Sequence, residues 1–449
     1  MSEPSPTSLP LDEHVCIRGG RVIDPHRGLD EVTDVVLKNG VIESVGPSAA
    51  TDCMVIDARG KLVVPGMIDL HAHIYRGVSC YGVSPDRAGV LAGVAHVNDV
   101  GSVGWMTFPG FEHYIVRGSR TPVTCWPNML SIGVPENWAM GATPFANETY
   151  YPELLAEHAR AHPNVIRGVK VWVERGFMSH LDEQWRAFEA ARKVTDLVPL
   201  NLYVHLGDLW PKHAGKPLID LDQMITEVVE RMRPGEVLGH CFTQFPGGLV
   251  NDEGKVSPAA KLATEKGILH EVGHGLNFSF KRARRFLDEG LPVDIISSDL
   301  HGLMNAGKIK PTLGLATDPG NVLNWSMMGT MTKCLALGMS LTDVIRAASY
   351  TPARAIGIAG EKGSLTPGFA ASISILELKP GKFKLVDSIG EHLAAEYLFI
   401  PEYTITGRDL WRCEPFELPE FQNDYVANNP MAFAGSRATN TFPSATESR

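Results

Sequence analysis

The sequence has few cysteines, no long hydrophobic run and no excess of positive charge. Its seven cysteines are an odd number without close pairs, so we expect reduced thiols, no structural disulfides and a cytoplasmic location. No apolar run approaches the about 20 residues of a membrane-spanning helix, and the N-terminus lacks the pattern of a signal peptide. A net charge of −10 favours solubility and argues against nucleic acid or an anionic membrane as partner.

Two sequence patterns divide the 449 residues. Short strand-like runs with the tight-turn signals Gly19-Gly20 and Asn39-Gly40 come first, and similar runs return near the C-terminus. Between them, short apolar runs alternate with helical periodicity, which is typical of a parallel barrel. We therefore predict an α/β protein with an N-terminal arm (1–14), a small β-sandwich domain formed from both chain ends (15–61 plus 362–414), a distorted (β/α)8 TIM barrel (62–361) and a partly disordered C-terminal extension (415–449).

The barrel prediction rests on eight expected strands and the helices between them. The strands cover residues 62–70, 93–99, 122–130, 165–172, 198–205, 236–240, 268–273 and 293–299. Helical periodicity is clearest over residues 151–161, 183–195, 221–232 and 281–289. A further helix is expected over residues 340–351, ending at Pro352.

Two histidines end the first of these strands. His71 and His73 are two residues apart, so in a strand their side chains project to the same side. Paired imidazoles of this kind form half of a site for zinc or a similar divalent ion. The ends of later strands supply further candidate ligands, namely Lys170, His205, His240 and Asp299.

Each candidate also has an ordinary structural interpretation. A single histidine is usually a satisfied core residue, Lys170 could extend to solvent from a strand end, and Asp299 could cap a helix. Their shared position at the C-terminal ends of five strands, where such barrels carry their functional residues, favours a metal site instead. Two cations about 3.5–4 Å apart need an anionic bridge. Lys170 would supply one as a carbamate, whereas its ammonium would be a buried cation beside the metal ions.

The order His-x-His, Lys, His, His, Asp resembles the amidohydrolase superfamily, in its dinuclear metal branch with a carboxylated lysine. The segments 239–242, 273–280 and 298–302 resemble the amidohydrolase/deacetylase group within it. The resemblance covers about residues 15–410. It implies a hydrolase that cleaves an N-acyl or O-acyl bond, deacetylase-like, through a metal-bridging hydroxide, and a homo-oligomer.

The resemblance also implies a role for each candidate ligand. Two divalent metal ions, most simply Zn2+, would be bound, and manganese, iron or cobalt suit the same ligands. His71, His73 and Asp299 would hold the more buried ion, and His205 and His240 the more exposed one. Lys170, as N6-carboxylysine, would bridge them. Asp299 would act as general base and acid.

Substrate contacts are expected from loops on the same face. Members of the deacetylase group carry an arginine two residues after the bridging lysine, and here that residue is Trp172. Arg175 is close enough in sequence to replace it as an anchor for a substrate carboxylate. His274, in a Gly-His-Gly turn, is expected to contact substrate or orient the hydroxide, or else to support its loop. His301 is expected to contact substrate or to hydrogen-bond a metal ligand.

Tryptophans in the same loops predict a pocket with apolar walls and a substrate that carries an apolar or aromatic group. They are Trp105, Trp138, Trp172 and Trp210. Two alternatives stay open: a cyclic amidase of the dihydroorotase or hydantoinase kind with the same ligands, and a catalytically inactive scaffold on the same fold. The sequence names neither the acyl group nor the leaving group, and it assigns no role to the C-terminal extension.

Overall fold

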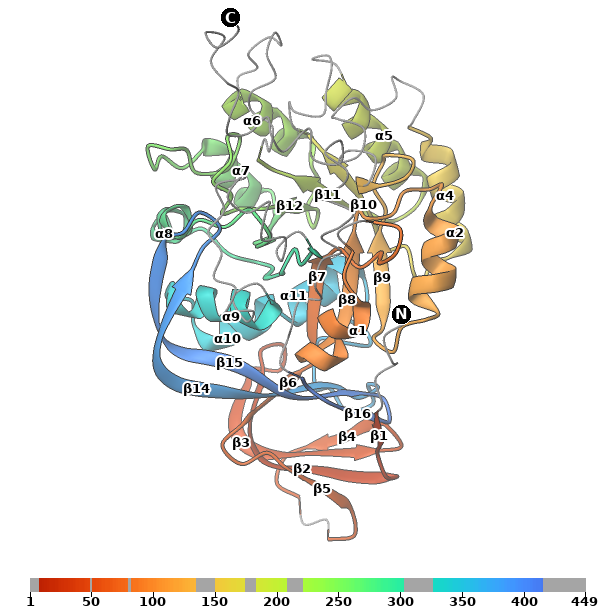
Figure 1. The fold of residues 1–449 in the computed structure, drawn as a ribbon, viewed down its shortest axis with the longest axis vertical. Coiled ribbons are helices and arrows are strands. Elements are labelled where there is room, and N and C mark those ends of the chain that lie inside the picture. Colours follow the sequence, from red (N-terminus) through yellow and green to blue (C-terminus); the bar gives the residue numbers. More distant parts are fainter. Residues whose placement is uncertain are drawn as a thin grey trace, which may run out of the picture.

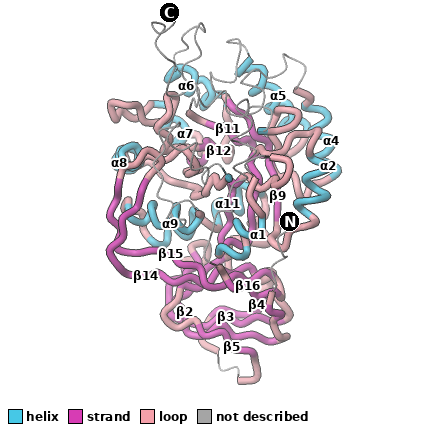
Figure 2. Tube along the Cα trace, viewed as in Figure 1, coloured by secondary structure: helices cyan, strands magenta, loops and turns pink. Residues whose placement is uncertain are grey.

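The computed structural model describes residues 8–48, 51–79, 82–134, 150–173, 183–207, 221–302 and 326–414. It has a mixed α/β architecture with two parts (Figure 1). Parallel strands surrounded by helices form the larger part, and a curved sheet of mostly antiparallel strands forms the other end of the molecule. Figure 2 separates the two by colour, since the helices gather around the parallel strands. The predicted C-terminal extension, residues 415–449, lies outside the described residues.

A nine-stranded sheet combines strands from both ends of the chain. Its order is β1-β16-β15-β14-β6-β2-β3-β4, with β5 beside β2. The first strand pairs with β16, which attaches part of the predicted N-terminal arm to the sheet. The strands are β1 (Leu9–Pro10), β2 (His14–Asp24), β3 (Leu29–Lys38), β4 (Val41–Val45), β5 (Met54–Asp57), β6 (Leu62–Pro65), β14 (Ser372–Val386), β15 (His392–Thr406) and β16 (Asp409–Arg412).

The remaining strands are parallel and form two smaller sheets, of order β7-β8-β9 and β10-β11-β12-β13. Almost every residue in them is buried, as expected for parallel strands covered on both faces. The strands are β7 (Met67–Ala72), β8 (Val94–Val100), β9 (Val123–Trp126), β10 (Gly168–Trp172), β11 (Asn201–His205), β12 (Val237–Gly239) and β13 (Leu269–His270).

Parallel bridges join these two sheets in a ring. Cys125 pairs with Ile166 just before β10, and Glu271 pairs with Ile295 just after β13. A last bridge, between Leu300 and Ala72, returns to β7. The segment expected as an eighth strand, residues 293–299, forms no continuous ladder: Ile295 makes one isolated bridge, and Leu300, just beyond the segment, makes the other.

The first expected strand, residues 62–70, is two strands. It breaks at Gly66, where a Cβ atom would lie 2.4 Å from Ser372 Oγ and 2.5 Å from Ala95 Cβ. Residues before the break, β6, pair with β14 and β2 of the nine-stranded sheet. Only residues after the break, β7, join the parallel strands. The change between the two parts thus falls at residue 66, four residues beyond the predicted boundary.

Helices and short turns connect the strands on the outside of the ring (Figure 1). The helix expected over residues 340–351 is two helices, and Pro352 lies in the first turn of the second, where no intrahelical partner for its missing N–H is needed. The helices are α1 (Pro85–Ala88), α2 (Phe108–Gly110), α4 (Pro152–Ala161), α5 (Glu183–Leu197), α6 (Leu221–Arg231), α7 (Pro258–Glu265), α8 (Phe280–Asp288), α9 (Met327–Ala336), α10 (Leu341–Ala347) and α11 (Tyr350–Ile356), with the short 3-10 helix η1 (Val90–Ala92) and the short π-helix η2 (Phe111–Val116).

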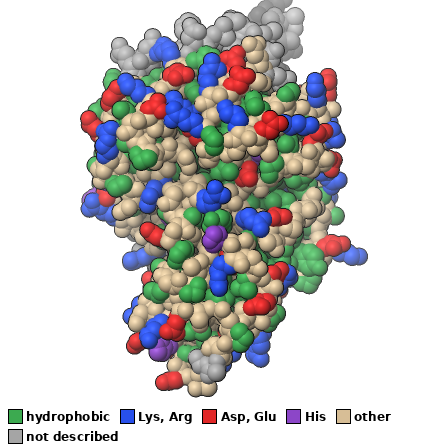
Figure 3. Space-filling model, turned by 180° about the vertical axis from the view of Figure 1, so that it is seen from behind, with side chains coloured by type: hydrophobic (Ala, Val, Ile, Leu, Met, Phe, Trp, Pro, Cys, Tyr) green, Lys and Arg blue, Asp and Glu red, His purple; other side chains and the backbone are tan. Residues whose placement is uncertain are grey.

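The distribution of charge on the surface and the state of the cysteines both agree with the composition. Acidic and basic side chains are interspersed over the face seen in Figure 3, without a large area of one sign. The six cysteines in the described part of the chain are free thiols. None of the helices described is long and apolar enough to cross a membrane.

Candidate metal centre

The six predicted ligands converge at one end of the parallel strands. His71 is in β7 and His73 follows it, Lys170 is in β10, and His205 ends β11. His240 follows β12, and Asp299 precedes the bridge at Leu300. All six are at most 5% exposed. The structure therefore brings the whole predicted set together from five separate segments.

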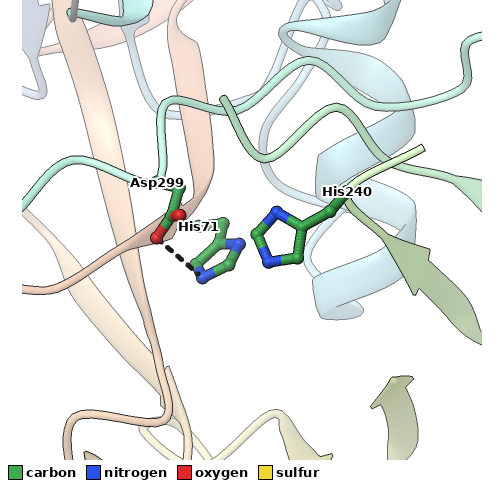
Figure 4. Close-up of side chains that lie close together, drawn as sticks. All are labelled: His71, His240 and Asp299. Carbon is green, nitrogen blue, oxygen red and sulfur yellow. Dashed lines mark ion pairs between the residues drawn. The ribbon is translucent and has the colours of Figure 1, made fainter. Parts of the chain in front are cut away.

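Two histidines lie beside the Asp299 carboxylate, and Lys170 lies next to one of them. Nε2 of His71 lies 3.3 Å and Nε2 of His73 lies 3.1 Å from the same oxygen, Oδ1 of Asp299. Lys170 Nζ lies 3.4 Å from Nε2 of His71 and donates a hydrogen bond to the Val100 carbonyl at 3.1 Å. Figure 4 shows His71 and Asp299 facing one another, with His240 beside them.

The other two histidines lie on the far side of His71. The rings of His205 and His240 are 4.3 Å apart between centroids, and the ring of His240 is 5.3 Å from that of His71. Nδ1–H of His240 donates to the Gly273 carbonyl at 2.8 Å. Because a carbonyl only accepts, this bond leaves the lone pair of His240 on Nε2.

Burial keeps these imidazoles neutral. It lowers the pKa of His240 to about 4, and it lowers the pKa values of His71, His73 and His205 well below the usual value for histidine. The positive charge of Lys170 acts in the same direction on all four. Neutral imidazole is the form that binds a metal ion.

The site contains nitrogen atoms that the protein does not satisfy. Nε2 of His240 and the ring nitrogens of His205 are buried without a hydrogen-bond partner among the described residues. Ligand atoms of His71, His240 and Asp299 lie within 4.8 Å of one another. Buried polar atoms of this kind usually have an ion or water as partner. This donor set of imidazole nitrogens and a carboxylate therefore fits divalent metal ions.

The backbone is strained at two of the candidate ligands. His240 has φ of +63° and Asp299 has φ of +45°, and among the described residues only Asn39 is another non-glycine residue with positive φ. Such conformations cost on the order of 1–3 kcal/mol and persist where the surrounding structure enforces them. Both side chains therefore face the other candidate ligands, although the backbone conformation that places them there is energetically unfavourable.

A buried carboxyl group that the sequence analysis missed supports three of the strands. Glu271 accepts hydrogen bonds from Tyr203 Oη at 3.0 Å and from the backbone N–H of His240 at 3.2 Å. Its other oxygen lies 3.3 Å from Nδ1 of His71 and contacts Ser297 Oγ. Burial raises the pKa of Glu271 to about 8. This residue ties the ring of His71 to the segments that carry His240 and Asp299.

A second missed carboxyl group holds the segment before Asp299. Asp69 accepts hydrogen bonds from the backbone N–H of Ser298 at 3.0 Å and of His71 at 3.3 Å, and it also bonds the Ser298 hydroxyl. Burial raises its pKa to about 7. Both Asp69 and Tyr203 stand two residues before a candidate ligand, so strand alternation was a signal that could have identified them.

The predicted substrate contacts have different surroundings. Trp172 is nearly buried, and its ring lies 4.9 Å from the ring of His205. His301 is 6% exposed, and its ring is 6.0 Å from that of His73. His274 is fully buried, with Nδ1 3.1 Å from the Gly275 carbonyl. Arg175 lies outside the described residues, as do Trp138 and Trp210.

Comparison with known proteins agrees with this geometry. The model of the amidohydrolase family matches residues 281–424. A deacetylase of Brucella anthropi is 28% identical over 389 residues, covering 85% of this chain and 88% of its own. A deacetylase of Agrobacterium fabrum is 27% identical and covers 84% and 86%, respectively. A crystal structure of a dihydroorotase superposes with a TM-score of 0.75 and 26% identity, covering 91% of this chain and all of that one.

The fold, the convergent ligand set and these similarities agree. The chain is similar to proteins of the amidohydrolase superfamily over most of its length, and these similarities support a hydrolytic enzyme.

Proposed function

We propose that the protein is a metal-dependent hydrolase that cleaves the acyl amide or acyl ester bond of a small molecule, as a deacetylase does. The observation that carries the proposal is the convergence of four neutral imidazoles, Lys170 and Asp299 in one buried site. The two deacetylases that match more than four fifths of the chain support this bond type over others.

In this proposal the site holds two divalent cations, of which zinc is the simplest. His71, His73 and Asp299 would hold one ion, and His205 and His240 would hold the other. Lys170, as N6-carboxylysine, would supply the anionic group that both ions need. Carboxylation replaces an ammonium group that is 1% exposed among four imidazoles with an anion, so it removes the unfavourable charge from the site. When bound, the cations lower the pKa of water and polarise a carbonyl oxygen.

Asp299 is the general base and acid in this proposal. Its carboxylate is 5% exposed and is fixed by the strained turn at φ +45°. It takes the proton of the attacking water and transfers it to the nitrogen or oxygen of the leaving group. Asp69 and Glu271 hold the backbone and rings around it and do not themselves exchange the proton.

Trp172 and His301 flank the histidines of the site, so we assign them to substrate contact. They place aromatic rings beside the candidate metal ligands, which supports a substrate carrying an apolar or aromatic group. Arg175 stays a predicted anchor for a substrate carboxylate. For His274 the contacts of the ring favour support of its own turn over contact with substrate, because Nδ1 and Nε2 face Gly275 and Lys333.

The finer architecture follows the same reasoning. We interpret the bridged ring of parallel strands as the distorted (β/α)8 barrel, and the nine-stranded sheet as the small β-sandwich domain. A homo-oligomer and a cytoplasmic location stay predictions, as does the absence of nucleic acid and membrane partners.

A cyclic amidase is the second candidate function. The dihydroorotase whose structure covers 91% of this chain favours it, because such an enzyme would use the same six ligands. Ring opening of dihydroorotate or hydantoin without deacylation would decide for it. An inactive scaffold on the same fold is disfavoured because all six candidate ligands are present and converge. If the purified protein binds no added zinc, the scaffold interpretation would be preferred.

The test is a hydrolysis panel with zinc-loaded protein and bicarbonate. It compares N-acyl amino acids, acyl esters and cyclic amides, and we expect turnover of one of the first two classes. Asp299→Asn should lose this turnover, whereas Asp196→Asn, which alters an exposed carboxylate paired with Arg233, should keep it. Absence of turnover across the panel in protein that binds zinc would refute the proposal.

A further inference from the structure

One long hairpin connects the nine-stranded sheet to the candidate metal centre. Strands β14 and β15 start in that sheet and run along one side of the molecule to α8 (Figure 1). Their connection, residues 387–391, therefore lies far from the rest of the sheet. Asp387 and Ser388 are fully buried there, although loop tips are usually exposed.

The tip is hydrogen-bonded to the turn between β13 and α8. Ser388 donates its backbone N–H to the Phe278 carbonyl at 2.9 Å, and its Oγ accepts from the Phe278 N–H at 3.2 Å. Asp387 Oδ2 accepts from the N–H of Phe280 at 2.9 Å, at the start of α8. Its other oxygen accepts from Ile389 and Glu391 at 3.0 and 2.8 Å, which fixes the tip itself.

The same tip reaches the wall of the metal centre through Gly275. The Ser388 hydroxyl donates to the Gly275 carbonyl at 3.2 Å. Gly275 in turn donates its N–H to the Ser298 carbonyl at 2.9 Å. A Cβ atom on Gly275 would lie 1.9 Å from Asp299 Oδ2. The backbone of Gly275 therefore contacts the hairpin through its carbonyl and lies directly beside the carboxylate of Asp299.

A second contact holds the other side of this turn. The rings of His274 and Phe278 are stacked, with centroids 4.6 Å apart and an interplanar angle of 17°. Nε2 of His274 faces Nζ of Lys333 in α9. The neighbouring Thr332 accepts a hydrogen bond from Phe399 of β15 at 3.2 Å. The hairpin thus approaches the 274–278 turn both directly and through α9.

We propose that Ser388 is a positioning residue, through which the β14–β15 hairpin sets the place of the Gly275 backbone and so the orientation of Asp299. The catalytic role of Asp299 is taken from the proposed function. In this proposal, strands from the C-terminal part of the chain help to position a residue of the candidate metal centre. Ser388 itself touches neither the ligands nor the reacting atoms.

The chain offers a matched control for the test. Ser374 is also fully buried in β14, donates its hydroxyl to a glycine carbonyl, Gly93, at 2.7 Å, and accepts from the N–H of Met67 at 3.0 Å. Ser374 lies near the start of β14 and Ser388 just beyond its end, so Ser388→Ala and Ser374→Ala remove the same kinds of hydrogen bond from the two ends of this segment. We expect both variants to unfold at similarly lower temperatures.

The two variants should differ in the metal centre. With Co2+ as the bound metal, Ser388→Ala should change the visible absorption spectrum, which reports ligand geometry, whereas Ser374→Ala should leave it unchanged. In steady-state assays Ser388→Ala should lower kcat by about ten-fold with KM nearly unchanged, because small displacements of a catalytic group have effects of this size. Asp387→Asn, which weakens the bond to Phe280, should act in the same direction and replaces Ser388→Ala if that variant does not fold.

An unchanged cobalt spectrum in Ser388→Ala and Asp387→Asn would overturn the inference. Equal losses of kcat in Ser388→Ala and Ser374→Ala would overturn it too, since the effect would then be one of general stability. If the wild-type protein hydrolyses nothing in the panel, the proposed function fails, and the cobalt spectra still decide whether the hairpin positions the ligands.

Discussion

Replacing Gly275 with alanine tests the arrangement of the site most directly. The added Cβ would lie 1.9 Å from Asp299 Oδ2 and 2.9 Å from Asp299 Cβ. Real Cβ atoms do not come closer than about 3.0 Å to such neighbours, so the carboxylate must shift by about 1.1 Å. The Gly275 backbone has little room to move instead, because its N–H and carbonyl are both bonded.

A shift of about 1 Å in a catalytic group costs a factor of about 10² in rate. This factor corresponds to about 2.7 kcal/mol of lost transition-state stabilisation. We therefore expect Gly275→Ala to lose about 10² in kcat toward whichever substrate the hydrolysis panel identifies. The assay is steady-state kinetics at saturating metal, together with elemental analysis of bound metal.

Backbone strain has to be separated from the clash. Gly275 has φ of +30°, a conformation that alanine adopts at a cost of about 1–2 kcal/mol. Gly290 has φ of +73° with no atom within 4 Å of a Cβ placed there. Gly290→Ala therefore carries the strain alone and should lose stability without losing turnover. The reasoning fails if Gly275→Ala folds, binds metal and keeps kcat within about three-fold of the Gly290→Ala enzyme.

Three further predictions concern the buried charged groups. Lys170→Met should reduce the metal content from about two ions per chain and abolish turnover, and full metal loading by elemental analysis would contradict the bridging role. Asp69→Ala leaves the N–H and hydroxyl of Ser298 without their acceptor, so the free energy of unfolding in urea should fall by about 1–3 kcal/mol; an unchanged value would mean that these bonds do not contribute. Burial lowers the pKa of His270 to about 4, so between pH 6.5 and 4 the unfolded chain binds the proton more readily, and this residue alone lowers the stability of metal-free protein by about 3 kcal/mol as the pH falls. His270→Gln should lose correspondingly less over this range in urea titrations at pH 7 and 4, and equal losses would show that His270 is not responsible.

The convergence of the six candidate ligands was predictable because each has two independent signals, its residue type and its position in or just after the last part of a predicted apolar strand. His205 and His240 illustrate this, since each ends or follows a strand that pairs with its neighbour in parallel. Glu271 had no such signal. Its role depends on Tyr203 and Ser297, which lie 68 and 26 residues away in the chain, and only the folded structure reveals those neighbours.

The long hairpin was also beyond the sequence patterns. Pro380 and Gly381 read as the end of a strand, because proline lacks an N–H and glycine favours turns. In the structure β14 continues through them to Val386, with a register shift between Pro380 and Phe383. The irregular pairing accommodates Pro380 and Gly381 within the strand. Many side chains of β14 are also exposed, so neither alternation nor hydrophobicity in the sequence indicates the full length of the strand.

The nine-stranded sheet has a consequence for how the chain reaches its folded state. Its β6 lies between β14 and β2, which makes contacts between residues roughly 300 positions apart. Closing so long a loop is entropically unfavourable and slow. During synthesis, the edge of β6 that pairs with β14 stays unpaired until the ribosome has released nearly the whole polypeptide. We therefore expect a nascent chain halted before residue 372 to expose this edge and to depend on chaperones, and hydrolytic competence to arise only after translation has passed the last strands.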